Sequence, residues 1–234
     1  MPQTWGQSIY GLWSEKFTNP CNHQLSPREI NESEMYQFWT RLELNGQYLD
    51  VVQKAKLLGF HITNDLKWDV NTESLVKRAN KRMELLRKVS SFGTSKDEKR
   101  NIYILFIRSI LEQSATVWHS SLTEENVLDL ERVQKSAVKL ILKDKYRGYQ
   151  QGLAELGLEN LRERREQLCL EFAKRCARNE KLKHMFPINN TKHQMQTRKH
   201  EKYLVEKANT KRFQNSAIIY MQRLLNRIEA EKSK

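Results

Sequence analysis

The hydrophobic pattern changes its period near Asp69, and this change most constrains what the chain can fold into. After this residue, apolar side chains recur at spacings of three and four, as they do along one face of a helix. The first such stripe comprises Leu75, Val76, Ala79, Met83, Leu86 and Val89. The chain has 8 Gly and 4 Pro, too few for the many turns of a β-sandwich. We therefore expect a mostly α fold, in which a small β-hairpin leads into a helical bundle followed by a C-terminal helix.

Turn residues and helix caps predict where these elements begin and end. Asn45-Gly46 suits the two positive-φ positions of a type I′ hairpin, and residues 56–62 are predicted to form a further short strand. Ser95 and Glu98 have the spacing of a capping box, which predicts a helix from Lys96 to about Trp118, and Thr123 begins another helix. The predicted segments are an irregular leader at 1–40, a hairpin segment at 41–68, a helical bundle at 69–182, a polar linker at 183–201 and a C-terminal basic helix at 202–234.

The charge favours an acidic partner. The chain has 41 Lys and Arg against 28 Asp and Glu, a net charge of +13, and residues 51–234 alone carry +16. This balance points to nucleic acid or an anionic membrane face. The chain has no run of 18 apolar residues and no signal peptide, so we expect no membrane span and an intracellular location, nuclear or cytoplasmic. Of three cysteines, Cys169 and Cys176 share one helical stripe and are expected in the core.

No motif predicts catalysis, a metal or a cofactor. Glycine-rich phosphate loops and the Gly-x-Ser-x-Gly elbow are absent from the sequence. His184, His193 and His200 have no metal-ligand spacing and are expected at the surface. An acidic cluster lies at the start of the helix after Thr123, where carboxylates commonly stabilise the helix dipole; its members are Glu124, Glu125, Asp129 and Glu131.

Two basic helix faces are the candidate binding residues. The first comprises Lys77, Arg78, Lys81 and Arg82, which fall along one side of the helix after Asp69 and could contact successive phosphates. The second comprises Arg162, Arg164, Arg165, Lys174 and Arg175. Alternatively these cations are only solvated or pair with nearby carboxylates such as Glu73, Glu84 and Glu166.

The order of several motifs resembles the C-terminal part of a non-LTR retrotransposon reverse transcriptase. These motifs are Lys-Leu-Leu-Gly-Phe-His-Ile-Thr-Asn-Asp-Leu-Lys-Trp at 56–68, Leu-Leu-Arg-Lys-Val at 85–89, the helix 103–118, Leu-Glu-Arg-Val-Gln at 130–134, Leu-Glu-Asn-Leu-Arg-Glu-Arg-Arg at 158–165, Thr-Lys-Arg-Phe-Gln-Asn-Ser-Ala at 210–217 and Leu-Leu-Asn at 224–226. The resemblance covers about residues 42–228 and leaves 1–40 unmatched.

The resemblance implies a thumb-like bundle that binds template–primer nucleic acid, an RNA–DNA or RNA duplex. Leu58 and Gly59 would then stand at the primer-grip position, and the cations after Asp69 would contact the backbone. Such polymerases hold two metal ions with palm aspartates, typically in an Asp-Asp turn, and this chain has no Asp-Asp. We therefore expect a noncatalytic fragment of such a polymerase.

Residues 56–88 also show a second resemblance, to a different family. The stretch Leu-Gly-x-x-Ile-x-x-Asp-Leu-x-Trp and the basic helix after it are similar to the N-terminal region of alkB homologue 8, a tRNA-modifying dioxygenase and methyltransferase. That dioxygenase chemistry needs His-x-Asp and a distal His to hold iron, and none of the six histidines here has Asp at the second following position. The methyltransferase's glycine-rich loop is also absent, so the resemblance implies shared sequence without the activity.

A third hypothesis is a helical relic or interaction protein without nucleic-acid function. Its exposed apolar helix faces would then cause self-association. The salt dependence of association distinguishes these hypotheses. Binding through phosphate contacts weakens as salt rises, because it releases counterions, whereas apolar association hardly weakens with salt.

Overall fold

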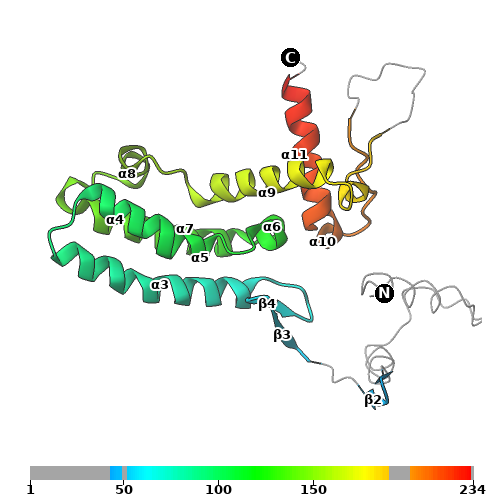
Figure 1. Ribbon diagram of the computed structural model, residues 1–234, viewed down its shortest axis with the longest axis horizontal. Coiled ribbons are helices and arrows are strands. Elements are labelled where there is room, and N and C mark those ends of the chain that lie inside the picture. Colours follow the sequence, from blue (N-terminus) through cyan, green and yellow to red (C-terminus); the bar gives the residue numbers. More distant parts are fainter. Residues whose placement is uncertain (1–42, 49–51, 190–200, 233–234) are drawn as a thin grey trace, which may run out of the picture. The chain divides into compact units, whose positions relative to one another are not determined.

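The computed structural model describes residues 43–48, 52–189 and 201–232, and the predicted leader 1–40 lies outside them together with Cys21, His193 and His200. The mostly α fold with a hairpin before the helices is confirmed (Figure 1). Contacts divide the chain into two compact units, one up to Val52 and one from Gln53 onward. In the first unit, strands β1 (Glu43–Leu44) and β2 (Gln47–Tyr48) pair antiparallel. Asn45 and Gly46 between them have φ of 52° and 80°, as predicted for a type I′ turn.

Residues 54–63 form a hairpin where the sequence pattern predicted one strand. Strands β3 (Lys54–Leu57) and β4 (Phe60–Thr63) pair antiparallel around the turn residues Leu58 and Gly59, which have φ of 48° and 89°. Leucine rarely adopts a left-handed conformation, so the sequence did not signal this turn. The buried Phe60 ring lies 6.2 Å from the ring of Trp68 and anchors the hairpin to the helical part.

Replacing Gly59 by alanine is expected to destabilise the second unit by about 1–2 kcal/mol. A Cβ at this position would lie 2.6 Å from Nε2 of Gln113, and φ is +89°. Gly93 has φ +72° but open space around it, so Gly93→Ala isolates the backbone strain. Urea unfolding followed by circular dichroism measures both variants; equal losses would mean that the contact with Gln113 has no energetic effect.

The predicted capping box and N-cap are present in the helical bundle. Helix α3 (Asp69–Ser91) is followed by α4 (Lys96–Ile102), where Ser95 and Glu98 cap each other reciprocally. The Thr123 side chain accepts a hydrogen bond from the Asn126 N–H at the start of α7 (Glu124–Leu142).

The helix predicted from Lys96 to Trp118 is interrupted twice. It passes into a π-helix, η1 (Tyr103–Arg108), then α5 (Ser109–Leu111), and breaks before α6 (Ala115–Trp118) at Ser114, whose φ is 54°. The break turns the chain so that Trp118 is fully buried while its indole N–H donates to the Gln113 carbonyl at 2.9 Å. The stabilisation gained by burying the Trp118 side chain therefore outweighs the cost of interrupting the helix.

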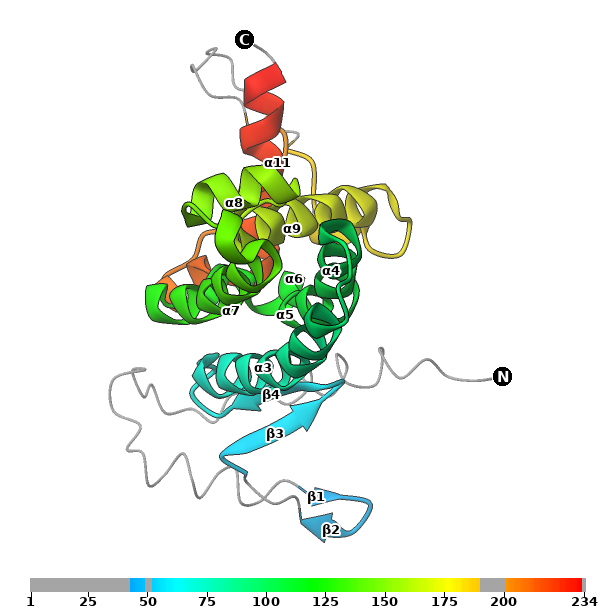
Figure 2. The ribbon, with the colours of Figure 1, turned by 90° about the vertical axis from the view of Figure 1, so that its left-hand side faces the viewer.

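The main core lies between α3, the α4–α6 segment, α7 and α8 (Tyr149–Leu156). Figure 1 and Figure 2 show α3 on one side of this bundle and α9 (Leu161–Arg178) on the other, with α5 and α7 between them. Short 3₁₀ turns, η2 (His119–Ser121) and η3 (Lys143–Lys145), flank α7. Tyr103, Leu86 and Leu130 are among the fully buried residues of this core.

The C-terminal helix begins later than predicted and packs on α9. Residues 201–210 are not helical, and the helices are α10 (Lys211–Gln214) and α11 (Ala217–Lys232). A second core between α9, η4 (Lys183–Met185) and α11 includes Cys169 and Cys176, which are buried as predicted, and Phe186. Phe186 belongs to the segment predicted as a polar linker. Residues 183–189 of that segment differ from the prediction because they contact residues far apart in sequence; for example, Gln222 Nε2 donates to the Met185 carbonyl at 2.8 Å. The Asn226 amide likewise bonds to both backbone groups of Tyr203, at 2.8 and 2.9 Å.

Candidate nucleic-acid interface

Helix α3 carries a basic ridge on its solvent side, which comprises Lys77, Arg78, Lys81, Arg82 and Lys88. All five side chains are exposed. At 100° per residue, Lys77, Lys81 and Lys88 point away from the buried side, whereas Arg78 and Arg82 lie on the flank of the helix, Arg82 nearest to the buried side. The buried side of α3 packs on α7 and η1, so the helix that carries the ridge is held in place by the bundle.

The cations of this ridge differ in whether they are paired. The Lys77 ammonium pairs with Glu73 Oε1 at 2.6 Å, and Arg78 Nη2 donates to Gln113 Oε1 at 2.8 Å. In the described part of the chain, the side chains of Lys81, Arg82 and Lys88 have no ion-pair or hydrogen-bond partner. Their charges are therefore available to an anionic ligand.

Leu58 and Gly59, for which the resemblance predicted a primer-grip position, form a turn that Gln113 connects to this ridge. Leu58 projects from the β3–β4 turn with 84% of its surface exposed, while Gly59 faces the Gln113 side chain. The same Gln113 amide accepts the bond from Arg78, so it connects the turn to the ridge. Gln113 was missed from the sequence because it lies in the interrupted helix, more than 30 positions from both partners.

The second predicted face, on α9, is largely engaged within the protein. The Arg162 guanidinium pairs with Glu124, and Arg164 Nε lies 3.3 Å from a carboxylate oxygen of Glu112. Lys174 is half-buried and Arg175 is exposed. Figure 1 places α9 across the bundle from α3, so these cations do not extend the α3 ridge.

Arg165 is a correction to the predicted binding set, because its side chain is fully buried. Its guanidinium carbon lies 5.8 Å from the Trp118 ring centre, and its Nε is 3.4 Å from His119 Nδ1. Burial lowers the pKa of Arg165 to about 10, and among the described residues Nη1 and Nη2 have no hydrogen-bond partner. The sequence pattern did not predict the burial of Arg165, because the helices that cover this part of α9, α6 and α11, are distant from it in the sequence.

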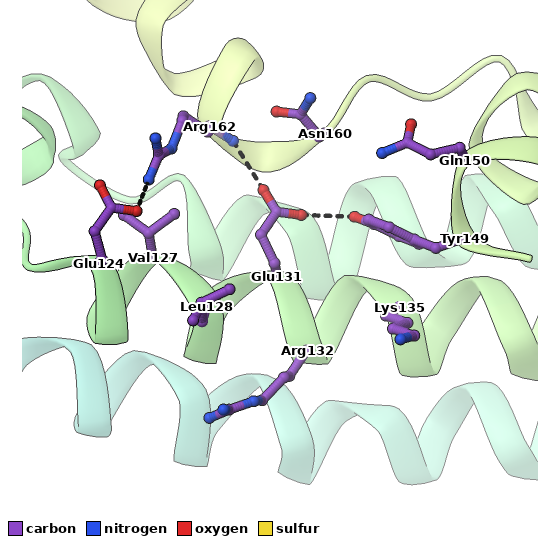
Figure 3. Close-up of a pocket in the computed structure, with 10 residues that line it drawn as sticks. All are labelled: Glu124, Val127, Leu128, Glu131, Arg132, Lys135, Tyr149, Gln150, Asn160 and Arg162. Atoms are coloured by element: carbon purple, nitrogen blue, oxygen red, sulfur yellow. Dashed lines mark hydrogen bonds and ion pairs between the residues drawn. The ribbon is translucent and has the colours of Figure 1, made fainter.

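A surface groove of about 590 Å³ lies between α7, α8 and the start of α9 (Figure 3). Glu131 lies at its centre, where it accepts bonds from the Tyr149 hydroxyl at 2.6 Å and the Arg162 backbone N–H at 2.9 Å. Burial, followed by the bond to Glu131, raises the pKa of Tyr149. Glu131 thus stabilises the N-terminus of α9, whereas the sequence placed it with the acids at the start of its own helix. The polar groups of the groove are therefore each other's hydrogen-bond partners.

Within the described ranges 43–48, 52–189 and 201–232, no three His, Cys, Asp or Glu residues are grouped so that they could bind a metal ion. His184, the one predicted surface histidine that these ranges include, is exposed. None of the helices described there has both the length and the apolar character that a membrane crossing requires.

No protein-family model, curated protein or solved structure matches this chain.

Proposed function

We propose that this chain binds the sugar–phosphate backbone of nucleic acid along the solvent side of α3. The observation that carries the proposal is the pair Lys81 and Lys88, which have no partner among the described residues and lie opposite the buried face of α3, with the unpaired Arg82 exposed on the flank of the same helix. Lys81 and Lys88 are separated by about 10 Å of helix rise, a distance over which a backbone presents more than one phosphate.

Lysine and arginine contacts of this kind position a nucleic acid without reading its sequence. The net charge of +16 beyond residue 50 adds long-range attraction. The resemblance of residues 42–228 to the thumb region of a non-LTR reverse transcriptase supports an RNA–DNA or RNA duplex as the ligand. The proposal is therefore a noncatalytic duplex-binding module.

Replacing Lys81 and Lys88 together by glutamine is expected to weaken binding of an RNA–DNA hybrid about tenfold at 0.1 M salt. Fluorescence anisotropy of the full chain with a labelled hybrid, repeated over a salt series, measures this. Contacts from Lys81 and Lys88 predict a slope of about −2 for log affinity against log salt, and the double variant is expected to lose this contribution to the slope.

The matched control is the Lys135→Gln, Lys139→Gln chain, which loses the same charge from exposed positions on α7. A site on α3 predicts a much smaller loss for this control. Equal losses would mean that only net charge matters, and the absence of any salt-dependent binding by the unmodified chain would refute the proposal. A Lys174→Gln, Arg175→Gln chain tests the α9 face in the same way.

Self-association is a second candidate, favoured by exposed apolar residues on η1. Leu105 and Phe106 are 65% and 46% exposed. A second copy of the chain covering this surface would bury apolar area and resist salt. Sedimentation velocity at low and high salt, with Leu105→Ser as the variant, tests it.

A further inference from the structure

Phe92 is the most exposed aromatic side chain of the described residues, with 82% of its surface in contact with solvent. It follows the last residue of α3, at the loop that leads to α4 (Figure 1). Its chain neighbours Ser91 and Gly93 are exposed and not apolar. This exposed phenyl ring has no part in the two hydrophobic cores.

The loop that carries Phe92 is held at both ends. The Phe92 N–H donates to the Val89 carbonyl at 3.1 Å, and the Thr94 hydroxyl donates to the same carbonyl at 3.0 Å. On the far side, Glu98 N–H donates to Ser95 Oγ at 3.2 Å and Ser95 N–H donates to Glu98 Oε2 at 2.7 Å. Because these bonds fix the backbone, the ring is presented to solvent at a defined place.

The ring continues the basic ridge of α3. Lys81, Leu85, Lys88 and Phe92 follow one another at spacings of four, three and four, which places them on one side of the helix. Lys88 stands one turn before the ring, and its ammonium has no partner in the described part of the chain. A nucleic-acid strand held by Lys81 and Lys88 therefore leads towards Phe92.

We infer that Phe92 stacks on an unpaired nucleobase at the end of a nucleic acid held along α3. The inference rests on the proposed function. Every base has a π-face that an aromatic side chain can cover, so stacking is independent of sequence and fits a surface that contacts only the backbone. A protein partner would instead need an apolar patch around the ring. The adjoining positions carry Lys88, Ser91 and Gly93, and the apolar Leu85, two turns before the ring, is 37% exposed against 82% for Phe92.

The experiment compares two RNA–DNA hybrids, one blunt and one with a three-nucleotide single-stranded end that contains 2-aminopurine. The full chain is expected to bind the second about tenfold more tightly and to quench its fluorescence. Phe92→Ala should lose this preference and the quenching while binding the blunt hybrid as before. Phe92→Trp should keep both. The control is Phe106→Ala, which removes an exposed ring from η1, outside the residue series that Lys81, Lys88 and Phe92 form.

The outcomes separate this inference from the proposed function. If the chain binds neither hybrid, the proposed function fails and the inference fails with it. If Lys81 and Lys88 are needed for the blunt hybrid but Phe92→Ala keeps the preference for the unpaired end, duplex binding stands and stacking is refuted. If Phe92→Ala alters only the oligomeric state in sedimentation, the ring contacts protein, which also overturns the inference. Thermal unfolding of each variant checks that it is folded.

Discussion

Replacing Gln134 by leucine is expected to lower the free energy of unfolding by about 3 kcal/mol, although leucine is the more hydrophobic residue. The Gln134 side chain is fully buried, and its Nε2 donates to the Tyr149 hydroxyl at 3.0 Å and to the Glu159 carbonyl at 2.8 Å. Its Oε1 accepts a bond from the Tyr103 hydroxyl, which is also buried. Leucine would leave the Tyr103 hydroxyl and the Glu159 carbonyl without this partner.

Chemical denaturation measures this change, and Gln151→Leu on the exposed surface of α8 is the matched control, expected to lie within about 0.5 kcal/mol of the unmodified chain. Adding Tyr103→Phe to Gln134→Leu should cost less than the sum of the two single changes, because the orphaned hydroxyl is removed. A loss below about 1 kcal/mol for Gln134→Leu would contradict a network that stabilises the bundle.

Acidification from pH 7 to pH 4 is expected to destabilise the chain by up to about 3 kcal/mol through His119 alone. Burial, and then the neighbouring Arg165 guanidinium, lower the pKa of His119 from 6.5 to about 4. The folded state therefore favours the neutral ring, while the unfolded chain takes up a proton near pH 6.5. Stability from this group is complete above pH 6.5, falls as the pH drops towards 4, and changes no further below it.

Unfolding free energies between pH 7 and pH 5 test this, because few carboxylates titrate in that range. His119→Gln should flatten the dependence, whereas His184→Gln, which changes an exposed ring, should not. Arg165→Met should reduce the slope, since it removes the cation whose Nε is 3.4 Å from His119 Nδ1. Parallel curves for the unmodified chain and His119→Gln would contradict the prediction.

The candidate site on α3 was largely visible in the sequence, and the reason is geometric. The exposure of Lys77, Lys81 and Lys88 follows from the helical period, because residues opposite a buried stripe face solvent. The helical period cannot show which cations form ion pairs with residues distant in the sequence. Arg162 and Glu124 are 38 positions apart, and only the packing of α9 near the start of α7 brings them together.

The sequence alone determined the helical class, the Asn45-Gly46 turn and the caps at Ser95 and Thr123, because each depends on residues within a few positions of one another. The tertiary structure decided the features that depend on distant partners. These include the turn at Leu58-Gly59 against Gln113, the burial of Arg165 and the docking of α11 on α9. In each case, packing contacts between distant segments outweighed the local preference of the chain.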